Sequence, residues 1–202
     1  MGMLTDEKSQ IYDTSGVHWA RVRLRESFDE IASLNPDLRI EQESSGEFVF
    51  MSPTGGESSS RNMEIAWQLM SWTKRYGGVC FDSSVIFCLP DGSKRSPDAS
   101  WITTDRWNAL SLVDRKKFPP ISPDFVIELR SESDRLATLQ DKMASYIQNG
   151  VRLGWLIDPS MKKVHVYRPS NNPDVLSNPE AVSAGEILQA FVLDLRAIWH
   201  AG

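Results

Sequence analysis

The stretch Ser122-Pro-Asp-Phe-Val-Ile-Glu-Leu-Arg-Ser131 decides the expected fold. Its centre, Phe125–Leu129, is nonpolar on both faces, which is typical of a strand in the middle of a sheet. Upstream, Pro97–Thr103 predicts a second strand, and each of these two strands opens with the tripeptide Ser-Pro-Asp. Downstream, a helix is predicted from about Asp134 to Asn149, and Gly150 ends it. These elements predict a sheet with a helix packed on it.

The rest of the chain alternates extended and helical patterns in the same way. Ser27 is placed to cap a short helix through Leu34, and Gly77-Gly78 ends a long helix that begins near Glu57. Further strands are predicted at 38–43 and 47–51 as a hairpin, at 79–89 as one bent or two short strands, and at 153–157 and 164–167. The pattern also predicts a short helix at 104–110, a polar loop at 113–122 and a tail at 186–199 that packs against the core. We therefore expect an α/β fold with a mixed β-sheet flanked by helices, built by one domain at 21–202 that follows a flexible N-terminal arm at 1–20.

Composition limits the class of protein. With a net charge of −5 and a pI near 5.3, the chain lacks the basic balance of proteins that hold nucleic acid by bulk electrostatics. Acidity does not exclude a nuclease, because catalytic carboxylates add negative charge that a bound cation offsets. No apolar run predicts a membrane span, and the polar N-terminus lacks the apolar core of a signal peptide. Cys80 and Cys88 lie in an apolar stretch, so we expect a reduced, cytoplasmic protein, with a disulfide between neighbouring strands as the alternative.

Two carboxylates are expected to meet where the two Ser-Pro-Asp strands run side by side. If these strands pair antiparallel, Asp98 at the start of one lies beside Glu128 near the end of the other. Two neighbouring carboxylates repel each other unless a cation neutralises them. Mg²⁺ and Mn²⁺ take such oxygen ligands readily, and can polarise a phosphate and activate water. The sequence therefore predicts a divalent-metal site suited to phosphodiester hydrolysis.

Three other charged residues bear on this pair. Lys142 flanks the buried face of its predicted helix, where it either reaches the carboxylates or extends into solvent. Glu64 flanks the apolar face of the long helix, and either adds a carboxylate to the site or is an exposed helix residue. Asp124 is four residues from Glu128, or about 13 Å at about 3.3 Å a residue, so we expect it to be structural.

The long helix carries apolar residues on two sides. Ile65 and Leu69 belong to one face, and Met63, Trp67 and Met70 form a second stripe on nearly the opposite side. A helix that is apolar on two sides is either buried or supports a partner. A homodimer through the second stripe and simple burial of that stripe are both open.

The quoted stretch also resembles the PD-(D/E)XK nuclease signature, because Pro97-Asp98 is followed by Asp124-Phe-Val-Ile-Glu128-Leu-Arg-Ser131. More closely, residues 25 to 200 resemble the Uma-two family of restriction-endonuclease-like proteins. The family pattern is matched by this central block and by Met51-Ser-Pro53, Asp134, Lys142, Tyr146, Gly150-Val151, Trp155, Asp158-Pro159, Phe191–Leu195 and Trp199. The chain departs from the pattern at Arg130, where the superfamily has a lysine, at Ala190, where a glycine is common, and at Ser58–Ser60, where a histidine is common.

The resemblance implies a restriction-endonuclease-like fold with Asp98 and Glu128 as metal ligands. It also implies that Lys142 takes the lysine's role, because an arginine at position 130 stays charged and cannot act as a base. We expect a Mg²⁺- or Mn²⁺-dependent endonuclease acting on DNA, in which the Leu129 carbonyl assists the metal and Lys142 stabilises the transition state. Glu64 would hold a second ion or a water. The alternative is a non-catalytic nucleic-acid- or protein-binding module on the same fold, and a small-molecule metallohydrolase is a third class.

Overall fold

The computed structural model describes residues 19–22, 27–35, 37–51 and 53–200. The predicted arm at 1–20 lies outside them except for its last two residues, which belong to strand β1 (Trp19–Val22). Within the described residues, both cysteines are free thiols. None of the helices described is long and apolar enough to cross a membrane.

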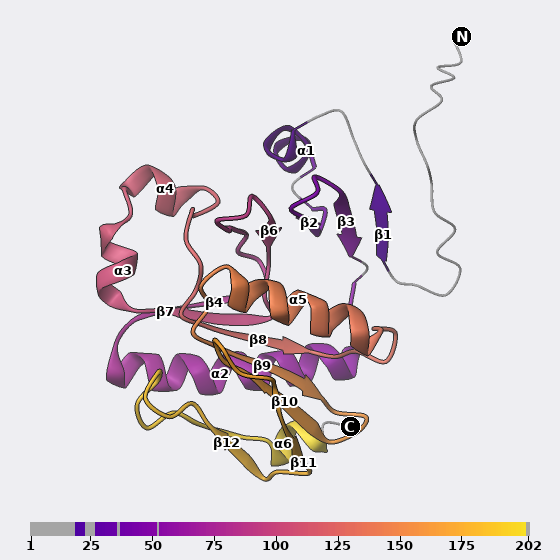
Figure 1. The fold of residues 1–202 in the computed structure, drawn as a ribbon, viewed down its shortest axis with the longest axis vertical. Helices are drawn as coiled ribbons and strands as arrows, with labels where there is room; N and C mark the ends of the chain where they lie inside the picture. Colours follow the sequence, from indigo (N-terminus) through magenta and orange to yellow (C-terminus); the bar gives the residue numbers. More distant parts are fainter. Residues whose placement is uncertain (1–18, 23–26, 36, 52, 201–202) are drawn as a thin grey trace.

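A six-stranded mixed sheet forms the centre of the molecule (Figure 1). Its strands follow the order β11 (Asp174–Ser177), β10 (Lys163–Tyr167), β9 (Leu153–Asp158), β8 (Phe125–Leu129), β7 (Ala99–Ile102) and β4 (Val79–Asp82). β8 and β9 are parallel, because the helix that connects them crosses over one face of the sheet, whereas the other neighbouring pairs in this sheet are antiparallel. The expected α/β fold with a mixed sheet is confirmed.

Two long helices cover opposite faces of this sheet (Figure 1). α5 (Leu136–Gln148) packs on one face, and α2 (Gly56–Tyr76) packs on the other together with the C-terminal tail. The tail contains β12 (Ala181–Ser183), β13 (Val192–Asp194) and α6 (Arg196–Trp199). Its apolar residues Phe191, Leu193 and Ile198 are buried among side chains of α2 and the sheet. The predicted packing of the tail against the core is therefore confirmed.

Strand β8 sends side chains to both faces of the sheet, because side chains alternate along a strand. Phe125 and Ile127 belong to the core on the α2 side, and Val126 belongs to the core on the α5 side. By the same alternation, Glu128 faces α5, and it is only 4% exposed. A buried carboxylate needs polar partners, and α5 supplies them.

A smaller, five-stranded sheet lies beside α5 (Figure 1). Its order is β1, β3 (Phe48–Met51), β2 (Ile40–Gln42), β6 (Lys94–Arg95) and β5 (Phe87–Cys88). β2 and β3 form the predicted hairpin. Helix α1 (Phe28–Leu34) packs on Phe48 of this sheet through Phe28. As predicted, Ser27 caps α1, through a capping box with Glu30.

The structure corrects one predicted element and decides another. The polar stretch 113–122, predicted as a loop, contains most of helix α4 (Leu112–Lys116), which follows α3 (Thr104–Ala109). The Ser111 hydroxyl accepts a hydrogen bond from the Asp114 amide at 3.1 Å and so starts a turn of helix that lacks an apolar face. The stretch 79–89 forms two short strands, β4 and β5, which belong to different sheets.

The second apolar stripe of α2 is exposed in the single chain. Met63, Trp67 and Met70 are 71%, 62% and 43% exposed, whereas Ile65 and Leu69 are buried against the sheet. Simple burial of the stripe within this chain is therefore wrong, because the helix has only one face in contact with the sheet and the tail.

Candidate active site

The predicted pair of carboxylates converges where two neighbouring inner strands of the central sheet, β7 and β8, begin and end. β7 and β8 are antiparallel with Ala99 opposite Ile127, so the register continues to Asp98 opposite Glu128. The Asp98 carboxylate accepts a hydrogen bond from the Leu129 amide at 2.8 Å, which fixes it beside the end of β8. Both carboxylates line one pocket of about 200 Å³. The antiparallel pairing on which the prediction rested is confirmed.

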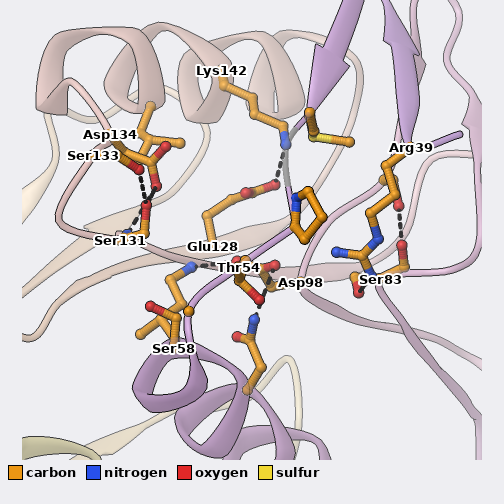
Figure 2. Close-up of a pocket in the computed structure, with 17 residues that line it drawn as sticks. Arg39, Thr54, Ser58, Ser83, Asp98, Glu128, Ser131, Ser133, Asp134 and Lys142 are labelled. Carbon is orange, nitrogen blue, oxygen red and sulfur yellow. Dashed lines mark hydrogen bonds and ion pairs between the residues drawn. The ribbon is translucent and has the colours of Figure 1, made fainter. Parts of the chain in front are cut away.

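Helix α5 brings Lys142 into this pocket. The Lys142 ammonium lies 2.8 Å from Oε1 of Glu128, and only 12% of its side chain is exposed. Tyr146 lies four residues later, on the same side of the helix, and its hydroxyl donates to the same Oε1 at 2.9 Å. Of the two predicted alternatives for Lys142, the structure has the one in which the side chain reaches the carboxylates (Figure 2).

A third buried carboxylate, Glu41, comes from strand β2 of the smaller sheet. Its Oε1 lies 2.9 Å from the Lys142 ammonium and accepts a hydrogen bond from the Ser96 amide at 2.8 Å. Its Oε2 lies 3.3 Å from Arg95. Glu41 is not among the residues predicted from the sequence, because a single glutamate in a short, mostly polar strand has the pattern of a solvent-exposed residue. Only the packing of the smaller sheet against α5 buries it.

Burial and charge shift the ionisation of these groups in different directions. Burial and the neighbouring carboxylates Asp98 and Glu41 raise the pKa of Glu128 to about 8, although Lys142 opposes the shift. Burial also raises the pKa of Asp98. Burial would raise the pKa of Glu41 as well, but Lys142 and Arg95 outweigh it and hold that pKa below its ordinary value. Burial lowers the pKa of Lys142, and its two carboxylate partners more than reverse this, so the ammonium form is favoured.

Most of the other residues that line the pocket have polar side chains (Figure 2). Arg39 extends along one side and donates to the Ser83 hydroxyl at 2.7 Å. Opposite it, the Asp134 carboxylate accepts from the Ser131 amide and hydroxyl, which shapes the turn after β8. Hydroxyl groups that line the pocket come from Thr54, Ser58, Ser83, Ser96, Ser131 and Ser133. Such a lining suits a charged, hydrogen-bonding ligand rather than an apolar one.

The structure does not bring Glu64 to the carboxylates, which corrects the expected position of this residue. Glu64 accepts a hydrogen bond from Gln68 and lines a separate hollow beside Met63 and Trp67. Asn62 is the residue of α2 that faces Asp98, with its amide nitrogen 3.4 Å from Oδ1. Two residues correspond to about 200° around a helix, so when Asn62 faces the pocket Glu64 faces away from it.

Arg130 and Asp124 also lie outside the pocket. Arg130 forms an ion pair with the buried Asp158 at 2.7 Å and donates to the Asp134 carbonyl, so it is tied to the strand ends and does not occupy the position of Lys142. Asp124 is fully buried at the opposite end of β8, where it pairs with Arg106 at 2.8 Å and accepts from the Thr103 amide. These contacts are those of a structural residue, which is the role expected for Asp124.

The donor set suits a hard divalent cation that keeps part of its water shell. Asp98 and Glu128 offer carboxylate oxygens at one point, and burial raises the pKa of both. No cluster of three or more His, Cys, Asp or Glu side chains in the described part of the chain has a metal-binding arrangement. Mg²⁺ is commonly held by one or two carboxylates with waters as the other ligands, so two carboxylates fit it.

Comparison with known protein families bears directly on this site. Residues 25–196 match the model of the Uma2 family, which is described as "Putative restriction endonuclease". The chain belongs to the Uma2 family. The predicted resemblance is thus confirmed, and the match includes every residue of the pocket.

Among solved structures, this Uma2 protein is similar to a chain from Anabaena variabilis ATCC 29413, described as "a putative nuclease belonging to DUF820". The two have a TM-score of 0.68 and 21% sequence identity, and the similarity covers 79% of this chain and 89% of the other. At this identity, the likeness shows a shared fold. No curated protein matches the sequence.

Proposed function

We propose that this Uma2 protein is a Mg²⁺- or Mn²⁺-dependent endonuclease that hydrolyses phosphodiester bonds in DNA. The observation that carries the proposal is the meeting of Asp98, Glu128 and Lys142 in one polar pocket. The description of the family as a restriction endonuclease supports a nucleic acid as the substrate. The raised pKa values of the two carboxylates support a bound cation, because a cation would stabilise the charged forms that burial disfavours.

Each of the three residues has a separate task in this proposal. Asp98 and Glu128 bind the metal, with the Leu129 carbonyl as a further ligand. When bound, the metal supplies Lewis-acid polarisation of the phosphate and activation of water. The Lys142 ammonium stabilises the negative charge that develops on the phosphate oxygens, and it does so from a nearly buried position where such charges interact strongly.

The rim of the pocket supplies contacts for the phosphates on either side of the scissile bond. Ser58, Ser131 and Ser133 present hydroxyl groups, and Arg39 presents an exposed guanidinium. These local donors offset the acidic balance of the whole chain, because phosphate binding depends on charges close to the substrate path. Binding of DNA in this pocket therefore requires no basic face over the whole molecule.

A cleavage assay with matched variants tests this function. Plasmid and single-stranded DNA are incubated with the parent in Mg²⁺ and in Mn²⁺, beside Asp98→Asn, Glu128→Gln and Lys142→Met. We expect cleavage by the parent and a loss of at least about 100-fold in each variant, since each removes a group that contacts the metal or the developing charge. Glu64→Gln is the matched control, because it neutralises a carboxylate on α2 that faces away from the pocket.

The assay also decides between the proposed enzyme and the alternative module. Folding of each variant is checked by circular dichroism, and Mn²⁺ binding is measured by calorimetry. Absence of both cleavage and Mn²⁺ binding in the parent would favour a non-catalytic nucleic-acid- or protein-binding module. Loss of cleavage in Glu64→Gln with Mn²⁺ binding intact would return Glu64 to the catalytic residues.

A further inference from the structure

Glu41 differs from the other two carboxylates of the site in the charge of its partners, because it forms ion pairs with two cations, Lys142 and Arg95. Oε1 receives the Lys142 ammonium and the Ser96 amide, and Oε2 faces the Arg95 guanidinium. Its side chain is 3% exposed. A carboxylate with three cationic or amide donors, and almost no access to solvent, is poorly suited to bind a metal ion. It is well suited to hold a positively charged side chain in place.

The cation that it holds is the proposed catalytic lysine. The Lys142 ammonium lies between Oε1 of Glu41 at 2.9 Å and Oε1 of Glu128 at 2.8 Å. A metal on Glu128 would compete with Lys142 for that carboxylate and repel the ammonium, because two cations would then share one anion. Glu41 is the partner that remains, and it stands on a different sheet from Glu128.

Arg95 and Ser96 make this anchor rigid and tie it to the metal pair. Arg95 is 5% exposed and pairs with both Glu41 and Glu43, so Glu41 is held between two buried cations. The Ser96 amide, two residues before Asp98, donates to Glu41. The smaller sheet, the start of β7 and helix α5 are therefore joined at the Glu41 carboxylate.

We propose that Glu41 is a positioning residue that holds the Lys142 ammonium beside the scissile phosphate when Glu128 binds the metal. This inference rests on the proposed function. Without Glu41, Lys142 has Glu128 as its remaining carboxylate partner, so it competes more strongly with the metal and is placed less well for catalysis. Glu41 thus acts through Lys142 and not on the metal.

A double-mutant cycle tests this dependence. Glu41→Gln keeps the size of the side chain and removes its charge, and Glu41→Asp keeps the charge but withdraws the carboxylate from Lys142. Both are expected to lower kcat about tenfold or more while KM for DNA stays nearly constant, because orientation in the transition state is lost and not substrate binding. If Glu41→Gln does not fold, Glu41→Asp, which keeps the buried charge, carries the test.

The matched control is Glu43→Gln. Glu43 lies two residues further along the chain and also pairs with Arg95, but Lys142 has no ion pair with it within the described residues. Glu43→Gln is expected to keep kcat within about twofold of the parent, because Arg95 can still pair with Glu41, and Glu41 with Lys142, when residue 43 is neutral. A loss equal to that of Glu41→Gln would mean that the negative charge of the smaller sheet matters in general, and would overturn the assignment to Glu41.

The decisive comparison is the effect of Glu41→Gln in a Lys142→Met background. In the parent, Glu41→Gln is expected to weaken Mn²⁺ binding about threefold or more. If Glu41 works through Lys142, the same substitution in the Lys142→Met background changes cleavage and Mn²⁺ affinity by no more than about twofold. Equal losses in both backgrounds would show that Glu41 acts independently of Lys142 and would overturn the inference.

Calorimetry with Mn²⁺ separates this inference from the proposed function. If the parent binds Mn²⁺ but cleaves no DNA, the nuclease proposal fails and the affinity cycle alone decides the role of Glu41. If the parent binds no Mn²⁺, both are overturned. Thermal unfolding of every variant confirms that the measured effects come from folded protein.

Discussion

At the scale of single residues, the site depends on how its surroundings set the charge of three buried carboxylates. Glu41 receives two cationic partners, and its pKa is lowered. Glu128 is equally buried but lies beside two other carboxylates, and its pKa is raised to about 8. The pKa values of two buried glutamates that share Lys142 are therefore shifted in opposite directions, because the balance of neighbouring charges differs.

The raised pKa of Glu128 predicts the pH dependence of metal binding. A proton must leave Glu128 before a cation binds it, so Mn²⁺ affinity should rise with pH, by up to about tenfold per unit, and level off above pH 8. In the metal-free protein the sign is the reverse. Because the pKa of Glu128 is higher in the folded protein than its ordinary 4.5, protonated Glu128 contributes stability that is fully present below pH 4.5. This contribution is lost as the pH rises through 8.

Calorimetric titrations and thermal unfolding between pH 5 and pH 9 would check both trends. Glu128→Gln should remove this contribution to the stability slope. Mn²⁺ affinity that does not change between pH 6 and pH 8 would contradict the raised pKa.

Tyr146→Phe should lower the free energy of unfolding by about 1 kcal/mol, because it deletes the hydrogen bond to Glu128 and leaves a buried oxygen with one donor fewer. The measurement is urea unfolding followed by tryptophan fluorescence. Tyr167→Phe is the control, because Tyr167 lies in the same core cluster and its hydroxyl makes no hydrogen bond within the described residues. Equal effects of the two changes would mean that the bond to Glu128 contributes nothing.

Arg130→Gln should lower stability by about 1–3 kcal/mol while leaving cleavage close to that of the parent, because Arg130 neutralises the buried Asp158 and lies outside the pocket. Denaturant unfolding and the cleavage assay measure the two effects separately. A large loss of cleavage without a loss of stability would instead assign Arg130 the role of the superfamily's lysine.

At the scale of elements, the turn between α2 and β4 controls where both elements lie on the sheet. Gly78 has φ of +87°, a conformation that favours glycine, and a β-carbon there would clash with the Trp101 indole ring. The indole nitrogen donates to the Gly77 carbonyl at 3.0 Å. The helix end and strand β7 are therefore packed too closely for any larger residue at position 78.

Gly78→Ala should destabilise the fold by about 3 kcal/mol, from the left-handed backbone and from displacement of the buried indole together. Gly92→Ala is the matched control, because Gly92 has the same φ of +87° with open space around its β-carbon position. Its cost should be only the backbone part, about 1–2 kcal/mol. Thermal unfolding of the two variants measures the difference, and equal values would mean that the contact with Trp101 is relieved without cost.

At the scale of the whole molecule, the exposed stripe of α2 remains a prediction of a contact between two copies. If Met63, Trp67 and Met70 form that contact, light scattering at micromolar concentration should give about twice the 22.8 kDa chain mass. Trp67→Ser should then return the mass to that of one chain. Leu112→Ser, which changes an equally exposed apolar residue on α4, should leave it unchanged. A parent that already has the mass of one chain would contradict the homodimer.

The sequence by itself determined the central strands, the helix after them and the meeting of Asp98 with Glu128. The strands and the helix follow from the local pattern of apolar residues. The meeting of the two carboxylates follows from the antiparallel pairing that was supposed for neighbouring strands and that the structure confirms. Lys142 was within reach of the same reasoning, because helical geometry placed it at the flank of the buried face.

Only the tertiary structure decided how these residues are surrounded. The packing of the smaller sheet against α5 buried Glu41 and gave Lys142 a second partner. The rotation of α2 against the sheet turned Asn62 toward Asp98 and Glu64 away from it. Contacts between elements far apart in the chain depend on how their side chains interlock, and this is not set by the periodicity of either element alone.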